Sequence, residues 1–216
     1  MADQTIDQER FFVIDHPLVA HKVSIMRDKD TSPAQFRQLV RELTMLEVFE
    51  ATRDLKTEPV SVQTPLMETT CQRIPKDALA VVPILRAGMG MLDGVLSVVP
   101  SAAVGVLGME RNEETFEPRE YYAKMPVGIE NRITLLIDPM LATGGSSLAA
   151  IRYLRRIGVK DIRLLVMVAA PSGVRRVLEA DPDVRIWTCA FDEGLNEQAY
   201  ILPGLGDAGD RIFGTV

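Results

Sequence analysis

The residues best suited to chemistry lie between Asp138 and Ser147, in the segment DPMLATGGSS. Its turn, Thr143 to Ser147, combines two glycines with three hydroxyl side chains where a helix is predicted to begin. Backbone N–H groups at a helix start, together with the positive end of the helix dipole, attract a phosphate. The turn alone fits an ordinary strand-turn-helix connection with a serine cap equally well. The carboxylate of Asp138 favours a ligand site, because an acid beside a phosphate can hold sugar hydroxyls or a metal ion.

Three other segments carry groups that could contact the same ligand. Arg86 opens the sequence RAGMG after a predicted strand, and the small residues behind it let a ligand approach the backbone. Arg111 follows a second predicted strand. The tail from Tyr200 to Asp210 holds three glycines among apolar residues, so its exposed backbone could pair with a planar heterocycle. A plain surface tail is the alternative, although solvated linkers are usually richer in serine and lysine.

The stretch from Glu110 to Gly128 is polar, contains prolines and is longer than a routine connection. Loops of this length in compact domains are usually functional or disordered. Its basic residues Arg111, Arg119 and Lys124, together with two tyrosines, predict a flexible lid over a charged substrate. An antiparallel hairpin on the surface is the alternative, and such a hairpin could itself be the lid.

The predicted secondary structure brings these segments to one edge of a sheet. Ile133 to Ile137 is a short apolar run, typical of a strand buried on both faces, and open α/β sheets bind ligands at the carboxyl ends of their strands. The other strands are predicted at 11–14, 60–62, 79–85, 103–109, 162–169 and 184–190. The helices are predicted at 17–26, 33–54, 66–74, 89–98, 146–157 and 173–179.

We therefore predict the α/β class, with a parallel-sheet core flanked by helices and right-handed crossovers. The length of 216 residues fits a single domain spanning residues 1–216. Within it, residues 1–77 would form an N-terminal helical cover over one sheet face, with dimerisation as a second use of these helices. Residues 110–128 would form the lid, and residues 191–216 the tail.

Composition excludes several classes of function. The chain is 47% hydrophobic and 25% charged, as soluble globular proteins are, and its net charge of −6 argues against a general nucleic-acid or anionic-membrane binder. No apolar run has the length of a membrane span and the first residues are polar, so we expect a cytoplasmic protein. Cys71 and Cys189 predict buried reduced thiols, and His16 and His21 structural roles.

The motifs also carry a family resemblance. DPMLATGGS resembles the phosphoribosyl diphosphate motif of type I phosphoribosyltransferases, and the whole set of motifs is similar to the uracil phosphoribosyltransferases. Pro139 replaces the second of the paired acids of the broad type I motif. This agrees with the uracil subgroup, leaves Asp138 alone for the ribose hydroxyls, and argues against direct ligation of a metal by the protein. The other matching motifs are ILRAG at Ile84–Gly88, RNEET at Arg111–Thr115, LNE at Leu195–Glu197 and IxPGLGDAGD at Ile201–Asp210.

The resemblance implies a role for each matching segment. The turn would bind the 5′-phosphate, Asp138 the ribose hydroxyls, and the tail backbone uracil. Arg86, Arg111 and Asp207 would contact the diphosphate and support the transition state as catalytic residues. The residues implied to bind phosphoribosyl diphosphate are Arg86, Arg111, Asp138, Pro139, Met140, Leu141, Ala142, Thr143, Gly144, Gly145, Ser146 and Asp207, and those implied to bind uracil are Ile201, Gly206, Asp207 and Ala208.

The implied activity is that of a pentosyltransferase of pyrimidine salvage, which converts uracil and 5-phospho-α-D-ribose 1-diphosphate to UMP and diphosphate. Mg²⁺ would be carried by the diphosphate, and no residue shows the pattern of a nucleophile with a paired base. The implied partners are the two substrates and further copies of the chain, as a homodimer or higher homo-oligomer, with no nucleic acid and no membrane. Some relatives are activated by GTP, which the sequence leaves open.

Two alternatives remain at this stage. One is a nucleotide-sensing regulatory protein on the same scaffold, and the other is a transferase for a different base. The acidic net charge and the complete tail motif argue against the first, and the tail motif argues against the second.

Overall fold

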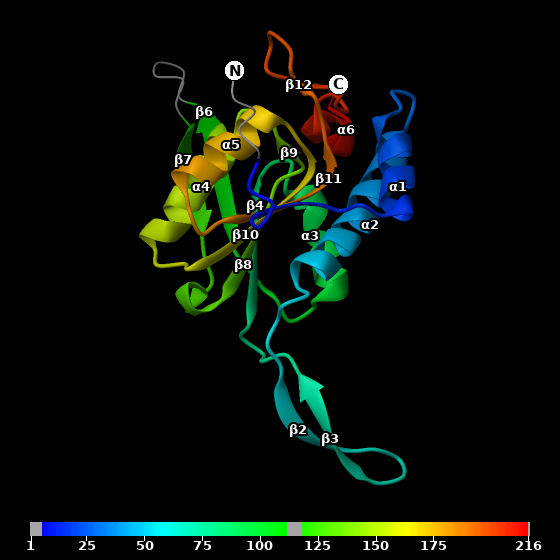
Figure 1. The fold of residues 1–216 in the computed structure, drawn as a ribbon, viewed down its shortest axis with the longest axis vertical. Helices are drawn as coiled ribbons and strands as arrows, with labels where there is room; N and C mark the ends of the chain where they lie inside the picture. The colour runs from blue at the N-terminus through cyan, green and yellow to red at the C-terminus, as the bar shows by residue number, and fades with distance from the viewer. Residues whose placement is uncertain (1–5, 112–117, 216) are drawn as a thin grey trace.

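The computed structural model describes residues 6–111 and 118–215. A central sheet lies between two layers of helices, and one long hairpin projects away from this body (Figure 1). Within the described ranges, no helix combines the length and the apolarity needed to cross a membrane.

The sheet has nine strands, and all of its pairs are parallel except the last, β6 with β7. The predicted α/β class with a parallel core is thereby confirmed. The predicted strand at 103–109 is divided into β5 (Ala103–Val104) and β6. Along the sheet the order is β1 (Phe11–Val13), β11 (Arg185–Phe191), β10 (Asp161–Ala169), β8 (Ile133–Ile137), β4 (Leu79–Leu85), β6 (Val106–Arg111) and β7 (Pro118–Lys124), while β5 pairs with β4 and β9 (Met140–Leu141) with β10.

Helices cover both faces, so that alternate residues of a strand enter two separate cores. In β4, Leu79 and Val81 pack in one core, and Ala80 and Val82 pack in the other. This is why the central strands read as continuous apolar runs instead of an alternating pattern. The first core is closed by α1 (Pro17–Arg27), α2 (Pro33–Ala51), α3 (Met89–Val98) and α6 (Ala208–Phe213), and the second by α4 (Gly145–Arg156) and α5 (Pro171–Ala180).

The N-terminal helices begin at the residues that the sequence indicates. Ser32 caps α2 by accepting a hydrogen bond from the N–H of Gln35 at 3.3 Å, and a proline follows at the first helical position. His16 caps α1, since its Nδ1 accepts from the N–H of Leu18 at 3.1 Å. The predicted structural role of His16 is therefore confirmed.

The predicted helix at 66–74 is wrong, and so the helical cover does not extend to residue 77. β2 (Glu58–Gln63) and β3 (Glu68–Arg73) form an antiparallel hairpin, here called the arm, and all six residues of β3 are exposed. A helix in this segment would have no core to face, and Thr69 and Thr70 favour the extended backbone. Cys71 is consequently exposed, against prediction, whereas Cys189 is buried as expected, and both thiols are free.

The remaining elements are short. They are the 3₁₀ turn η1 (Ile129–Asn131) and the antiparallel pair β12 (Gly194–Leu195) with β13 (Ile201–Leu202).

Candidate active site

A cavity of about 330 Å³ lies at the carboxyl ends of the central strands. It joins the ends of β4 and β8, which are hydrogen-bonded neighbours with Pro83 opposite Ile137, to the C-terminal tail. Segments that are far apart in the sequence therefore meet at one edge of the sheet, as predicted for a parallel α/β fold. The lining residues are Arg86, Ala87, Asp138, Met140, Ala142, Ala199, Tyr200, Ile201, Gly206, Asp207, Ala208 and Gly209.

The chain after β8 is fixed to β10 by its backbone. The N–H of Asp138 donates to the carbonyl of Leu165 at 3.2 Å, and the carbonyl of Pro139 accepts from the N–H groups of Met167 and Val168 at 3.0 and 3.2 Å. Pro139 lacks an N–H and ends β8, after which β9 resumes the pairing with β10. The carboxylate of Asp138 is thus held beside the turn that follows.

The turn ends on the first residue of α4 without a side-chain cap. Its cap residue is Gly144, not a serine, with the left-handed φ of +75° that glycine adopts readily. The first bond within the helix runs from the N–H of Leu148 to the carbonyl of Gly144 at 2.9 Å. The N–H groups of Gly145, Ser146 and Ser147 therefore have no acceptor within the helix, which suits a bound anion.

Asp138 has an unusual environment for a carboxyl group. It is only partly exposed, and burial raises its pKa to about 7, although a hydrogen bond from the backbone of Met140 opposes the shift. Burial therefore favours the neutral form of the group more than water does. Ribose hydroxyls could replace the lost water as donors and stabilise the charged form.

The tail reaches the opposite wall of the cavity. Ile201 and Ala208 are buried, while Gly206 and Asp207 between them are exposed. Asp207 caps α6, because its Oδ1 accepts from the N–H of Asp210 at 2.9 Å. The tail thus presents backbone groups to the cavity from a loop held at both ends.

Two arginines were predicted to meet the same ligand. Arg86 lies directly after β4, with its guanidinium 3.7 Å from Oδ1 of Asp210 and above the ring of Phe213 at 5.8 Å. Arg111 is the last residue of β6, whose end lies beside that of β4 because Leu85 pairs with Gly108. The side chain of Arg111 and residues 112–117 lie outside the described part of the chain, so the contact of Arg111 stays a prediction.

Comparison with known proteins gives one consistent result. A sequence profile of the uracil phosphoribosyltransferase family matches residues 13–215. The uracil phosphoribosyltransferase of Symbiobacterium thermophilum is 54% identical over 206 residues, which are 95% of this chain and 99% of the relative. The chain belongs to the uracil phosphoribosyltransferase family. It is therefore a pentosyltransferase, as the motifs predicted.

Solved structures share the fold of this chain. The AQ2163 protein of Aquifex aeolicus superposes with a TM-score of 0.88 at 40% identity, covering 94% of this chain and 97% of that one. An adenine phosphoribosyl transferase of Trypanosoma brucei, at 13% identity and a TM-score of 0.57 over 91% of this chain and 88% of its own, shares the fold alone. The type I phosphoribosyltransferase fold is confirmed.

Within this family site, the residues named from the sequence lie at different depths. Pro139 and Leu141 are buried and do not line the cavity, so they could meet a ligand only through their backbone. Thr143 to Ser146 follow Ala142, which lines the cavity, but do not line it themselves. The sequence reasoning did not name Ala87, Ala199, Tyr200 and Gly209 as binding residues, although they line the cavity. All of these except Ala199 stand inside or next to the quoted motifs, which was the available signal.

Proposed function

We propose that this enzyme transfers the 5-phosphoribosyl group of 5-phospho-α-D-ribose 1-diphosphate to N1 of uracil, giving UMP and diphosphate for pyrimidine salvage. The single observation that carries this proposal is the cavity that joins Asp138 and Ala142, the residue before the helix-start turn, to the glycine-rich tail, in a chain of this family. The bond from ribose C1 to the diphosphate oxygen breaks, the bond from N1 to C1 forms, and the N1 proton is released.

The turn and Asp138 would hold the ribose phosphate. The 5′-phosphate is assigned to the N–H groups of Gly145 and Ser146 and to the hydroxyls of Thr143 and Ser146. Both of these side chains are exposed beside the positive end of α4. The ribose hydroxyls are assigned to Asp138, which becomes a full carboxylate when they donate to it. This arrangement fixes C1 above the cavity and removes the entropic cost of bringing the reactants together.

The diphosphate would lie between Arg86, Arg111 and Asp207. Among the described residues, no group of three or more His, Cys, Asp or Glu is placed to hold a metal ion. We assign Mg²⁺ to diphosphate oxygens and water, with Asp207 beside it. Asp207 uses only Oδ1 to cap α6, so its Oδ2 could face the ion or its water. When bound, the ion would neutralise charge on the leaving group. Arg86 and Arg111 would supply further positive charge as the leaving diphosphate becomes more negative.

Uracil would be read by the backbone of the tail. Main-chain donors and acceptors at Ile201, Gly206 and Ala208 match the alternating carbonyl and N–H groups of the base edge. Cytosine reverses part of this pattern and would leave a buried group unpaired, at a cost of roughly 1–3 kcal/mol. Residues 110–128, which include β7 and the end of β6, are assigned as the lid that keeps water from the electron-deficient C1.

An assay with 5-phospho-α-D-ribose 1-diphosphate, Mg²⁺ and each pyrimidine or purine base in turn tests the activity. We expect UMP from uracil, no nucleotide from the purines, and loss of product when the metal is chelated. A protein that makes no UMP contradicts the proposal, and product from another base identifies a different transferase. Repeating the assay with and without GTP decides whether GTP is an activator.

We also propose that the enzyme is a homodimer in which each arm lies on the partner. The arm carries Leu66 and Met67 near its tip, which are 95% and 66% exposed, and it projects from the body (Figure 1). A two-stranded hairpin alone is marginally stable in water, so the arm needs a surface to pack against.

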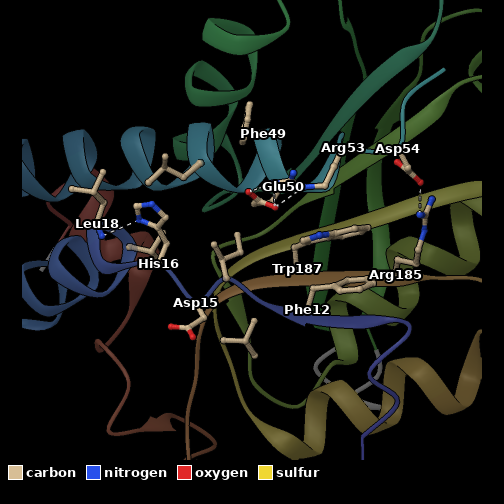
Figure 2. Close-up of a pocket in the computed structure, with 14 residues that line it drawn as sticks. Phe12, Asp15, His16, Leu18, Phe49, Glu50, Arg53, Asp54, Arg185 and Trp187 are labelled. Atoms are coloured by element: carbon tan, nitrogen blue, oxygen red, sulfur yellow. Dashed lines mark hydrogen bonds and ion pairs between the residues drawn. The ribbon is translucent and has the colours of Figure 1, made fainter. Parts of the chain in front are cut away.

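A groove of about 620 Å³ beside β1 and α2 supplies a suitable surface (Figure 2). It is lined largely by apolar side chains, among them Phe12, Trp187, Leu18 and Phe49, and the last two are 53% and 64% exposed. Arg53 and Asp54 line the groove just before the chain enters the arm, and the arm projects away from the body that carries the groove. In a two-fold dimer the same contact would occur twice, with each arm on the partner's groove.

Sedimentation of the wild type, of Leu66→Ser with Met67→Ser, and of Phe49→Asp tests this dimer. We expect both altered proteins to dissociate at concentrations where the wild type stays dimeric. Because each dimer would contain two arm–groove contacts, mixing the arm variant with the groove variant should restore one contact and part of the association. A wild-type monomer contradicts the dimer, and variants that stay dimeric contradict this interface.

We propose the cytoplasm as the location of the enzyme. Both cysteines are free thiols, as is usual in a reducing compartment. Fractionation of the source cells, with the activity as the marker, checks this.

A further inference from the structure

A buried ion pair attaches the tail to the end of α1. Arg27, the last residue of α1, donates from both terminal nitrogens to the carboxylate of Asp192, at 2.8 and 2.5 Å. Asp192 follows β11, its side chain is 5% exposed, and its N–H donates to the carbonyl of Ala169 at 2.9 Å. None of these residues belongs to the motifs that define the family resemblance. The pair joins an N-terminal helix to the sheet at the root of the tail.

Both members of this pair also hold Gly204. Arg27 donates to the carbonyl of Gly204 at 2.6 Å, and Oδ2 of Asp192 accepts from its N–H at 2.8 Å. Gly204 has a φ of +59°, and a Cβ there would lie 2.1 Å from the carbonyl oxygen of Ile201. Only glycine fits so close an approach. The direction of the chain leaving Ile201 is therefore fixed by contacts at both backbone groups of Gly204.

Arg211 holds the next residue of the loop. From α6 it donates to the carbonyl of Leu205 at 2.8 Å and to those of Met26 and Asp28, at the end of α1, at 2.7 and 2.5 Å. Its guanidinium also lies over the ring of Phe36, 4.4 Å from the centroid. Two arginines thus fasten successive residues of the loop to the same helix end.

The geometry points to Arg27, Asp192 and Arg211 as positioning residues that set the choice of base. None of the three lines the cavity, so they act on uracil only through the backbone from Ile201 to Ala208. Recognition by backbone groups needs fixed directions, because a donor or acceptor displaced by about 1 Å loses most of its discrimination. This inference rests on the proposed uracil site in the tail.

A second ion pair of nearly the same burial provides a matched control. Arg155 donates to both oxygens of Asp181, at 2.7 and 2.8 Å. The side chains of Arg155 and Asp181 are 24% and 10% exposed, against 24% and 5% for Arg27 and Asp192. The Arg155 pair joins the end of α4 to the end of α5, and neither residue lines the cavity. Loss of either pair should lower stability, but only loss of the Arg27 pair should change the use of uracil.

The test compares Asp192→Asn and Arg211→Lys with Asp181→Asn, at a temperature below every measured Tm. In the first two we expect the KM for uracil to rise about tenfold, as for loss of one charge-assisted hydrogen bond, and discrimination against cytosine to fall. The KM for phosphoribosyl diphosphate should stay within about twofold in all three, and Asp181→Asn should leave both constants unchanged.

The inference is overturned if the KM for uracil does not move, if both KM values rise together, or if the control behaves like Asp192→Asn. Should Asp192→Asn not fold, Arg211→Lys decides the same question, because lysine keeps the positive charge and leaves the Arg27–Asp192 pair in place. A wild-type enzyme that makes no UMP would contradict the proposed function instead, so the two failures are distinguishable.

Discussion

The two edges of the sheet hold carboxylates in opposite electrostatic environments. The amino edge is the side of the sheet where the parallel strands begin. There, Asp161 is the first residue of β10, and Asp54 lies beyond the end of α2. Each carboxylate accepts hydrogen bonds from both Arg163 and Arg185, at 2.5 to 3.4 Å. Burial alone would raise the pKa of both acids, but the two arginines outweigh it and lower the pKa. At the carboxyl edge, Asp138 has no such partner among the described residues, and its pKa is raised to about 7.

This difference separates stability from ligand binding. Hydrogen bonds to the amino-edge carboxylates are completed by the protein itself, so these groups hold α2 against the sheet. Among the described residues, the carboxyl-edge acid has no charged partner and the helix-start N–H groups have no acceptor within the helix, so a ligand can supply both. Parallel strands make the separation natural, because all their carboxyl ends open at one edge.

Asp138→Asn should produce the largest effect. The amide keeps the size of the side chain but cannot accept two hydroxyl hydrogen bonds as a charged group, so kcat/KM for phosphoribosyl diphosphate should fall about 100-fold, or about 2.7 kcal/mol. The free energy of unfolding should not fall, because a buried carboxylate is removed. Steady-state kinetics and urea unfolding measure the two quantities. Unchanged kinetic constants would remove Asp138 from the ribose site.

Arg163→Leu should show the reverse behaviour at the amino edge. Its side chain is only 2% exposed and its loss leaves Asp54 and Asp161 with fewer donors, so the free energy of unfolding should drop by about 3 kcal/mol. Both acids are partly exposed, which keeps the loss near the low end of the range for buried pairs. Below the unfolding transition, kcat/KM should stay within about twofold. A large kinetic defect in a folded variant would show that the two edges are not independent.

The pH dependence of stability should have opposite signs at the two edges. Asp138 titrates near pH 7 when folded and near 4 when unfolded, so its contribution is present below about pH 4 and is lost as the pH rises through 7. Asp54 and Asp161 contribute to the free energy of unfolding above about pH 4, and this contribution is lost as the pH falls through their lowered pKa values.

The difference in unfolding free energy between wild type and Asp138→Asn isolates the first of these contributions. We expect this difference to decline by at least about 1 kcal/mol from pH 4 to pH 7 and to be flat at higher pH. Urea unfolding at a series of pH values measures it. A difference that does not vary with pH would mean that the pKa of Asp138 is not raised.

The sequence predicts the carboxyl edge better than the rest of the molecule. Asp138 and its turn are contiguous, and a strand, an acid and a helix start within fifteen residues leave little freedom in how they are arranged. The tail and Arg86 could be added because parallel strands bring their ends together. The sequence did not identify Gly144 as the N-terminal cap of α4. The choice between Gly144 and a serine depends on backbone angles that the residue types alone do not determine.

Features that depend on distant partners could not be predicted in this way. Residues 66–74 were predicted as a helix, although this segment pairs with β2 in an exposed hairpin that has no core of its own to pack against. Arg27 and Asp192 are 165 residues apart, and the residues around each give no pattern that predicts the other as its partner. The raised pKa of Asp138 likewise depends on burial by the folded chain and not on its neighbours in sequence.

Arg156→Gln should have the smallest effect, and it tests whether an exposed ion pair between α4 and β7 is structural. Arg156 on α4 pairs with Glu120 of β7 at 2.8 Å, but the two side chains are 65% and 41% exposed. Water and salt screen such a pair, so the free energy of unfolding should change by less than about 0.5 kcal/mol.

Arg41→Gln, which breaks an exposed pair with Asp93 at 2.9 Å far from the hairpin, is the matched control. If Arg156→Gln lowers kcat more than the control while stability is unchanged, the pair couples the β6–β7 hairpin to α4 during closure. A stability loss of about 2 kcal/mol would instead show that this exposed pair is structural, contrary to the expected screening.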